Sequence, residues 1–145
     1  MQAVIFDLDE TLFASATTLH DGVADLLQVL RTLGFRLGVV SDGDHRALVR
    51  LEEAGVRHLF DGVLCASHRV NPKSPIAIQR LVEQLDADPA ESTFVGYNAG
   101  DILSGKHAGM RQTIRVAHGQ SADDRHPIDA DHVVGTVPAV LDVIG

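Results

Sequence analysis

The sequence has few basic residues and almost no cysteine, and both shortages exclude classes of protein. Its 145 residues include 12 lysines and arginines against 20 aspartates and glutamates, which gives a formal net charge of −8. Binding to a nucleic-acid backbone needs clustered basic side chains, so we expect no nucleic-acid partner. The single cysteine, Cys65, cannot form an internal disulfide, and this favours the reducing cytoplasm.

Long apolar segments and nucleotide-binding motifs are missing as well. No uncharged run approaches the ~18 apolar residues of a membrane-spanning helix, so we expect no membrane span. The first residues, MQAVIFDLDE, carry no basic segment and become acidic at Asp7, so we do not interpret them as a secretory signal. Neither a GxxxxGK[ST] loop nor a GxGxxG sequence occurs, so the sequence does not indicate a nucleotide cofactor.

What the sequence does contain is enough apolar material for one folded domain, which we expect to span residues 1–145. The chain is 45% hydrophobic and 22% charged, which excludes a disordered protein. Short apolar runs, typical of buried strands, alternate with segments of helical spacing. This alternation predicts an α/β fold made of βαβ units around a mostly parallel sheet of about five or six strands. The expected strands are 3–6, 36–40, 62–65, 92–95, 112–116 and 132–134, and the expected helices are 23–33, 44–55, 75–85, 101–108 and 136–143.

Polar residues of a restricted set of types follow the ends of the expected strands. Asp7 and Asp9 come after the first strand, Ser41 after the second, Lys73 in the connection after the third, and Asp101 after the fourth. Ligands of an open parallel sheet bind outside the carboxyl ends of its strands, so we expect these side chains to meet there. Carboxylates, a hydroxyl and an ammonium group together indicate phosphoryl transfer.

Each of these residues has a role in such a reaction. Asp7 can attack phosphorus as a nucleophile and form an aspartyl-phosphate. Asp9 is two residues away, so in an extended segment its side chain points the same way, and it can exchange a proton with the leaving oxygen and with water. A Mg²⁺ ion removes much of the repulsion between the carboxylate and the phosphate. Ser41 can donate a hydrogen bond to a phosphate oxygen, and Lys73 can neutralise developing charge.

These motifs, in this order, resemble the haloacid dehalogenase superfamily of phosphohydrolases. The resemblance extends over nearly the whole chain, from Asp7 to the GKHAGM segment at 105–110. The segment DLDET (7–11) matches the first motif of that family, DxDxT, at its two aspartates and at Thr11. Ser41 matches the Ser/Thr motif, Lys73 matches the basic motif, and VGYNAGD (95–101) lies where the fourth motif is expected.

The resemblance implies a Rossmann-like three-layer αβα sandwich with a small flap after the first strand, here residues 11–20. It implies Mg²⁺-dependent hydrolysis of a phosphate monoester, either a small molecule or an exposed group of a larger one. Thr11, Ser41 and Lys73 are then expected to hold the phosphate. The implied metal ligands are Asp7, the backbone carbonyl of Asp9, and Asp101.

Specificity in similar proteins comes largely from a cap domain, and the segments between the motifs of this chain leave no room for one. Relatives without a cap act on exposed groups of large substrates or cover the site with a neighbouring subunit, as a homo-oligomer. The sequence leaves both arrangements open, and it also leaves open whether water or a second substrate accepts the phosphoryl group.

One position departs from the family pattern. The fourth motif is often GDxxxD, and here it reads GYNAGD, so Tyr97 stands where the first acid is expected. A neutral phenol is a poor Mg²⁺ ligand, so we expect a weaker metal site. The alternative hypothesis is therefore a catalytically weak or inactive binding or regulatory protein of the same fold. A signalling receiver domain fits poorly, because its acceptor aspartate follows the third strand.

The remaining candidate ligands are interpreted as structural or surface residues. The eight histidines are scattered without paired ligand spacing, and the segment 123–132, rich in acids and histidine, is typical of a solvated loop. We expect a surface loop over 119–131. Cys65 ends an apolar strand and is expected to pack as a small hydrophobic side chain rather than to act as a nucleophile.

Overall fold

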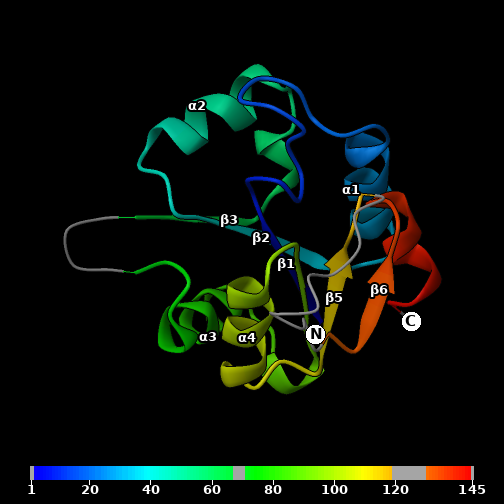
Figure 1. Cartoon of the computed structure of the whole chain (residues 1–145). Helices are drawn as coiled ribbons and strands as arrows, with labels where there is room; N and C mark the ends of the chain where they lie inside the picture. The colour runs from blue at the N-terminus through cyan, green and yellow to red at the C-terminus, as the bar shows by residue number, and fades with distance from the viewer. Residues whose placement is uncertain (1, 67–70, 119–129, 145) are drawn as a thin grey trace.

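The computed structural model describes residues 2–66, 71–118 and 130–144 (Figure 1). Its six strands form one parallel sheet in the order β3-β2-β1-β4-β5-β6. The strands are β1 (Ala3–Asp7), β2 (Arg36–Ser41), β3 (Gly62–Cys65), β4 (Thr93–Gly96), β5 (Gln112–Val116) and β6 (His132–Val134). The α-helices are α1 (Val23–Thr32), α2 (Arg46–Glu53), α3 (Pro75–Gln84) and α4 (Ala99–His107), and the 3₁₀ helices are η1 (Arg57–Leu59), η2 (Pro89–Glu91) and η3 (Pro138–Asp142).

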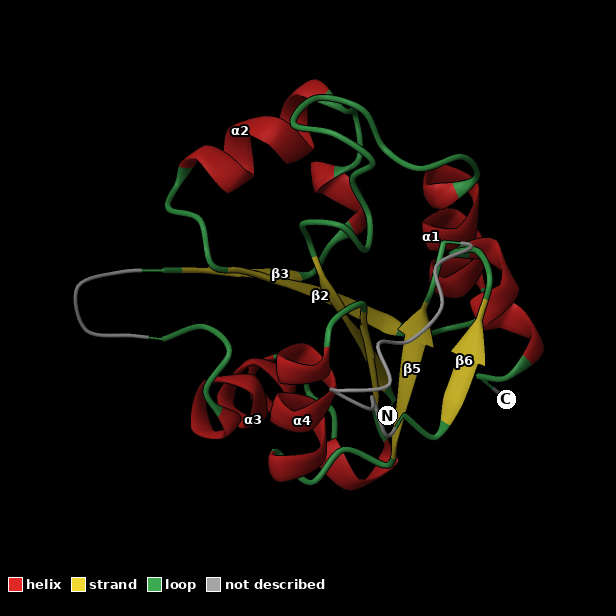
Figure 2. Cartoon of the chain, in the orientation of Figure 1, coloured by secondary structure: helices red, strands yellow, loops and turns green. Residues whose placement is uncertain are grey.

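The helices lie on both faces of the sheet, which gives three layers (Figure 2). α1, α2 and η3 cover one face, and α3 and α4 cover the other. The strand β1 shows why both faces are needed: Val4 and Phe6 pack into one hydrophobic core, while Ala3 and Ile5 pack into the other. A strand of this kind has an apolar residue at every position, as the run AVIF predicts. The predicted Rossmann-like α/β fold is therefore confirmed.

The segment after β1 is the small flap that the sequence predicts. β1 ends at Asp7, Leu8 lies in a bend, and single bridges join Asp9 to Phe13 and Phe13 to Leu19. Leu12 and Phe13 are buried and fix the flap to the core below α1 and α2. The flap thus starts directly at the carboxyl end of the central strands.

Two glycines allow α3 to approach the sheet closely. A Cβ atom at Gly38 of β2 would lie 3.2 Å from Leu85 Cδ1, and one at Gly62 of β3 would lie 2.9 Å from Leu81 Cδ1. The leucines of α3 therefore occupy the space that side chains would take on these two strands. This contact sets the distance between α3 and the sheet.

Three expected elements differ from the structure or fall outside it. The last expected helix, 136–143, is the short 3₁₀ helix η3, and α4 begins at Ala99 rather than at 101. Most of the expected loop 119–131 lies outside the described residues, as do His68 and His126. Within the described residues, no helix is both long and apolar enough to cross a membrane.

Candidate active site

Asp7 occupies the centre of the candidate site. It is the last residue of β1, which lies between β2 and β4, and it is 2% exposed. Lys73 Nζ lies 2.8 Å from its Oδ1, and the Thr11 hydroxyl donates a 3.2 Å hydrogen bond to its Oδ2. Burial, followed by the charge of Asp101, raises the pKa of Asp7 to about 7, although Lys73 opposes the shift. The carboxylate is thus held on both oxygens in a poorly hydrated position.

Lys73 is the cation that links the acids of the site. It precedes α3, whose first turn is fixed by Pro75 and by the hydroxyl of Ser74, which accepts a 3.2 Å hydrogen bond from the Ala77 N–H. Besides Asp7, its ammonium group lies 2.7 Å from Asp101 Oδ1 and 3.1 Å from Asp42 Oδ2. Burial lowers the pKa of Lys73, but the two buried carboxylates more than reverse this, so the amine stays charged.

Asp101 is positioned by the first turn of α4. Its N–H donates a 2.9 Å hydrogen bond to Asn98 Oδ1, and its own Oδ2 lies 3.5 Å from the Asn98 N–H, so the two residues form a capping box. The other oxygen, Oδ1, is the one that contacts Lys73. Gly96 leaves space for this carboxylate, because a Cβ atom there would lie 2.8 Å from Asp101 Cβ. The sequence analysis missed Asn98, whose spacing of three from Asp101 is the signal for a capping box.

Ser41 lies on the strand next to Asp7. Val40 is the residue paired with Asp7 in the β1–β2 ladder, and Ser41 follows it as the last residue of β2. Its side chain is buried, and its hydroxyl oxygen accepts a 3.0 Å hydrogen bond from the Gly43 N–H. The structure therefore brings together Asp7, Thr11, Ser41, Lys73 and Asp101, as the sequence predicts.

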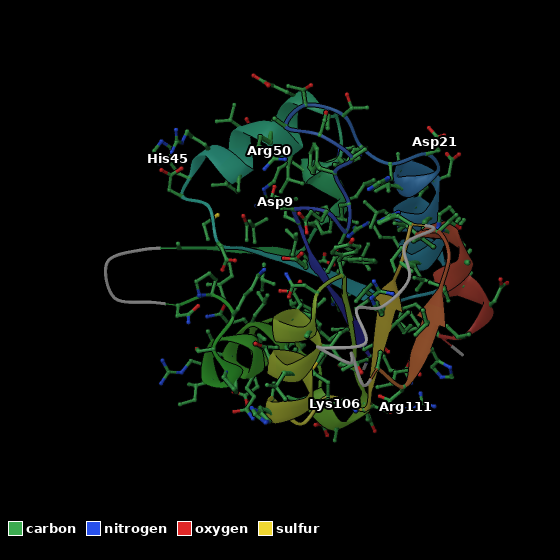
Figure 3. The ribbon with its side chains drawn as sticks, viewed as in Figure 1. Asp9, Asp21, His45, Arg50, Lys106 and Arg111 are labelled. Atoms are coloured by element: carbon green, nitrogen blue, oxygen red, sulfur yellow. The ribbon has the colours of Figure 1, made fainter. Side chains whose placement is uncertain are left out.

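Asp9 lies apart from this buried group. Leu8, between Asp7 and Asp9, lies in a bend just after β1. The Asp9 side chain is 52% exposed, and its Oδ1 lies 2.6 Å from Arg50 Nη1 on α2 (Figure 3). The sequence analysis gave no role to Arg50, because an arginine on a helix is ordinarily a solvated surface residue.

Tyr97 faces the end of β5. Its carbonyl oxygen accepts a 3.1 Å hydrogen bond from Arg115 Nε, and the Arg115 guanidinium lies 5.4 Å from the centre of its ring. The His118 ring is 6.2 Å away and stacks on the His20 ring at 3.6 Å. His118 Nε2 also lies 3.2 Å from the Thr11 carbonyl oxygen. Burial, with the neighbouring His20, lowers the pKa of His118. These residues join the flap to β5.

The oxygen atoms around Asp7 fit a weak Mg²⁺ site. Asp7 Oδ1 is buried and accepts no well-oriented hydrogen bond within the described chain, although Lys73 lies close to it. Mg²⁺ accepts carboxylate and carbonyl oxygens together with water. In residues 2–66, 71–118 and 130–144, no three His, Cys, Asp or Glu side chains are arranged to hold an ion. Asp7 and Asp101 would therefore depend on the Asp9 carbonyl and water to complete the ligand set.

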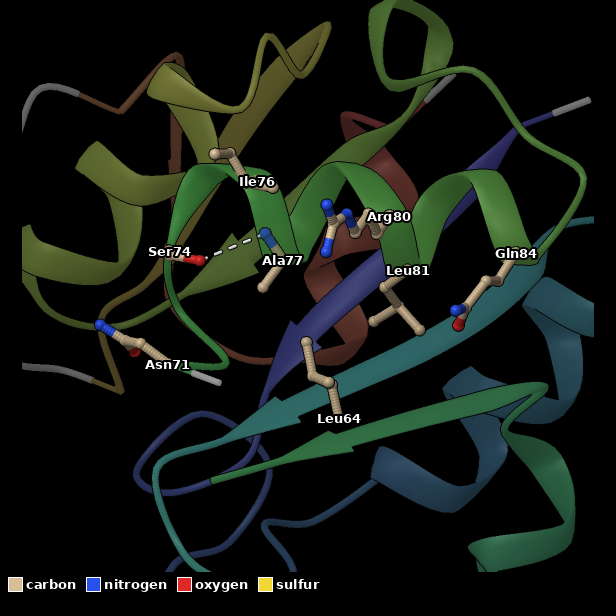
Figure 4. A pocket seen from close by; sticks show the side chains of 8 residues that line it. All are labelled: Leu64, Asn71, Ser74, Ile76, Ala77, Arg80, Leu81 and Gln84. Atoms are coloured by element: carbon tan, nitrogen blue, oxygen red, sulfur yellow. Dashed lines mark hydrogen bonds between the residues drawn. The ribbon is translucent and has the colours of Figure 1, made fainter. Parts of the chain in front are cut away.

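Two pockets lie on opposite faces of the sheet. A pocket of about 310 Å³ adjoins the site, between the flap and α2, and its lining includes Ser41, Arg46 and Arg50. We call it the α2 pocket. A pocket of about 490 Å³ lies between β3 and α3, and the side chains of Leu64, Ile76 and Arg80 are part of its lining (Figure 4). Ser41 of the candidate site lines the α2 pocket, whereas the lining of the pocket beside α3 includes Ser74, the neighbour of Lys73.

Comparison with known proteins agrees with this geometry. A family model described as haloacid dehalogenase-like hydrolase matches residues 14–115. Pyrophosphatase PpaX of Halalkalibacterium halodurans is 27% identical over 128 residues, which cover 87% of this chain and 60% of the relative. Phosphoglycolate phosphatase of Vibrio vulnificus is 29% identical over 131 residues, which cover 87% of this chain and 56% of the relative. The chain thus spans little more than half the length of these two curated relatives.

Two solved structures with the same fold are similar in extent to this chain. The crystal structure of a HAD phosphatase from Thermococcus onnurineus superposes with a TM-score of 0.86 at 17% identity, over 100% of this chain and 98% of that one. A HAD-superfamily hydrolase of subfamily IA from Geobacter sulfurreducens gives a TM-score of 0.82 at 17% identity, over 100% and 97%. At this level of identity the likeness concerns the fold.

Proposed function

Because the chain belongs to the haloacid dehalogenase-like hydrolases, we propose that it is a Mg²⁺-dependent phosphate monoester hydrolase that uses Asp7 as its nucleophile. The observation that carries the proposal is the placement of Asp7: a buried carboxylate at the end of a central strand, 2.8 Å from Lys73. The relatives' names point to small phosphate compounds, and pyrophosphate and phosphoglycolate are the first substrates to test.

The reaction proceeds in two steps. In the first, an Asp7 oxygen forms a bond to phosphorus, the bond from phosphorus to the ester oxygen breaks, and Asp9 gives a proton to the departing alkoxide. In the second, water attacks the phosphorus of the aspartyl-phosphate, Asp9 takes a proton from that water, and the bond to Asp7 breaks to release inorganic phosphate. The first step removes one proton from Asp9, and the second step restores it.

The other residues hold the phosphate and the charge. Ser41 and Thr11 donate hydrogen bonds to phosphate oxygens, and Lys73 neutralises charge that develops on them. Asp7, Asp101 and the Asp9 carbonyl would hold a Mg²⁺ ion, whose charge would reduce the repulsion between the nucleophile and the phosphate. Burial and the charge of Asp101 raise the pKa of Asp7 to about 7 although Lys73 opposes the shift, and a further cation beside Asp7 would favour its ionised form.

The substrate approaches an open site in this proposal. We propose a single domain over residues 1–145, and the described parts of the connections after β1 and β3 contain no inserted cap domain. An exposed phosphate group, or closure by a second subunit, would suit such a site, and sedimentation equilibrium distinguishes the two. We also propose that the protein is located in the cytoplasm, because its single cysteine, Cys65, suits a reducing compartment.

The test is hydrolysis of a panel of phosphate monoesters and pyrophosphate by the purified protein, with and without excess Mg²⁺. We expect Mg²⁺-dependent release of phosphate that is abolished in Asp7→Asn. If no compound of a broad panel is hydrolysed, the proposal fails for this chain.

A second candidate, a binding protein of the same fold without turnover, is favoured by Tyr97. Tyr97 stands at the position of the fourth motif where a metal-binding acid is expected. Its phenol ring lies near Arg115 and His118. The variant Tyr97→Asp separates the candidates: turnover that appears only in this variant supports the second, and turnover in the natural chain supports the first. Calorimetric titration with Mg²⁺ measures the same difference without requiring turnover.

A further inference from the structure

Arg50 makes an unusual number of contacts for a helix-surface arginine. Its Nη1 lies 2.6 Å from Asp9 Oδ1, its Nε donates a 2.9 Å hydrogen bond to the Ala16 carbonyl, and its Nη2 donates a 3.4 Å one to the Ser15 carbonyl. The guanidinium also lies 4.4 Å from the centre of the Phe13 ring. One side chain of α2 therefore holds the flap along most of its length, and Figure 3 shows Arg50 next to Asp9.

Arg50 also lines the α2 pocket, together with Ser41. A phosphate held by Ser41 and Lys73 would therefore place the rest of a small substrate toward Arg50. A guanidinium has five N–H groups in a planar fork, and the contacts with the described flap residues use three nitrogens of that fork. The Arg50 guanidinium can therefore bind a further anion, such as a carboxylate or a phosphate.

Arg46, the other arginine of the α2 pocket, is less suited to bind a substrate. Its Nε and Nη2 lie 3.0 and 3.2 Å from the two carboxylate oxygens of Asp44. Its side chain is 80% exposed, against 25% for Arg50. Arg46 and Asp44 therefore neutralise each other at the rim, and Arg50 is the partly desolvated cation beside Ser41.

From this arrangement we propose that Arg50 selects phosphate esters whose leaving group carries a second anionic group, a carboxylate or another phosphate. This inference rests on the proposed function. The second anion competes with Asp9 for the Arg50 guanidinium, and the Asp9 carboxylate, once released, turns toward the ester oxygen that it must protonate. Substrate recognition and the positioning of Asp9 thus depend on one exchange of ion-pair partners.

The exchange also accounts for how an acidic protein attracts a substrate with two anionic ends. The chain carries a net charge of −8, and the carboxylates of Asp7, Asp42 and Asp101 surround the ammonium group of Lys73. A second anion would be repelled by most of this surface. Arg50 supplies a fixed cation in a geometry that carboxylates and phosphates match with paired hydrogen bonds.

The test is a comparison of two probes of equal size, 2-phosphoglycolate and 2-hydroxyethyl phosphate, which differ in the second charge. Binding of each is measured by calorimetry in the Asp7→Asn background with Mg²⁺ present, so that the result does not depend on turnover. We expect the carboxylate of its leaving group to favour binding of phosphoglycolate by about tenfold, the typical value of one charge-assisted contact. Arg50→Gln should reduce the ratio to about one, and Arg50→Lys should give an intermediate ratio.

Arg80→Gln, in the pocket on the opposite face, is the matched control and should keep the full ratio. Circular dichroism and unchanged affinity for 2-hydroxyethyl phosphate show that each variant is folded. Equal binding of the two probes, a preference that survives Arg50→Gln, or no binding of either probe overturns the inference. If the natural chain hydrolyses no substrate but the Asp7→Asn background keeps the binding preference, the proposed function alone is overturned.

Discussion

The two sides of the candidate site are built differently. On the α3 side, Asp7, Lys73 and Asp101 form a buried group with contacts of 2.7 to 2.8 Å, supported by strand ends and a capped helix. On the α2 side, Asp9 and Arg50 form an ion pair between a flap and a helix surface, and Asp9 is half exposed. The buried side fixes the reacting atoms. The exposed side can exchange partners, because water and substrate reach it.

The difference has an energetic basis. A buried charge that loses its partner is costly, whereas an exposed ion pair contributes little to stability because water replaces the lost contact. The α3 side should therefore tolerate almost no change, and the α2 side should change specificity without loss of the fold.

The largest expected effect is the loss of the nucleophile. Asp7→Asn should lower kcat by at least about a thousandfold, because the amide cannot form the acyl-phosphate bond. Steady-state assays on the best substrate of the panel measure this loss. A variant that retains more than a tenth of the activity would assign the attack on phosphorus to another group.

Loss of the buried cation should come next. Lys73→Ala leaves Asp7 and Asp101 without their partner, and we expect the free energy of unfolding at pH 8 to fall by about 3 kcal/mol. The decrease should be smaller at pH 5, where Asp7, with its pKa near 7, is protonated. Urea denaturation at both pH values measures the effect, and Arg111→Ala, at an exposed position, is the control. An equal decrease in the free energy of unfolding of Lys73→Ala and Arg111→Ala, the exposed control, would contradict the contrast between the two sides of the site.

The pH dependence of stability without added metal tests the buried side in a second way. The folded pKa of Asp7 is raised, so its protonated form favours the fold, and this contribution is lost as the pH rises from about 4 through about 7. Asp7→Asn imitates the protonated form. It should be more stable than the natural chain by about 2 kcal/mol at pH 8 and equal to it at pH 3.5, as measured by urea denaturation. A constant difference across this range would show that Asp7 does not titrate as described.

The smallest expected effect concerns the exposed pair. Arg50→Gln should change the free energy of unfolding by less than about 1 kcal/mol, because Asp9 remains accessible to water. Thermal denaturation measures the change. A loss as large as that of Lys73→Ala would mean that the flap and α2 form a single structural unit, and the contrast between the two sides would disappear.

The sequence predicts the buried side better than the exposed side. Asp7, Ser41 and Asp101 can be placed together because each follows a strand, and parallel strands end at one edge of the sheet. The position of each residue directly after an expected strand is the signal that predicts the group. Arg50 carries no such signal, since its contact with the flap depends on how residues 8–20 fold back over α2.

Other misses have similar causes. The pairing of His20 with His118 joins segments far apart in the sequence, and neither histidine has a neighbour at ligand spacing. The expected final α-helix is a 3₁₀ helix in the structure. An apolar run of a few residues does not tell an α-helix from a 3₁₀ helix, so the sequence could not predict this difference.

The two glycines that face α3 leave little spare room between the sheet and the helix that follows Lys73. A Cβ atom at Gly62 would lie 2.9 Å from Leu81 Cδ1, and one at Gly38 would lie 2.7 Å from Ile5 Cδ1 and 3.2 Å from Leu85 Cδ1. A methyl group at either position would displace the ends of these side chains in a densely packed core. Substitution at Gly38 or Gly62 therefore offers a way to perturb the packing beneath Lys73 without changing a residue of the candidate site.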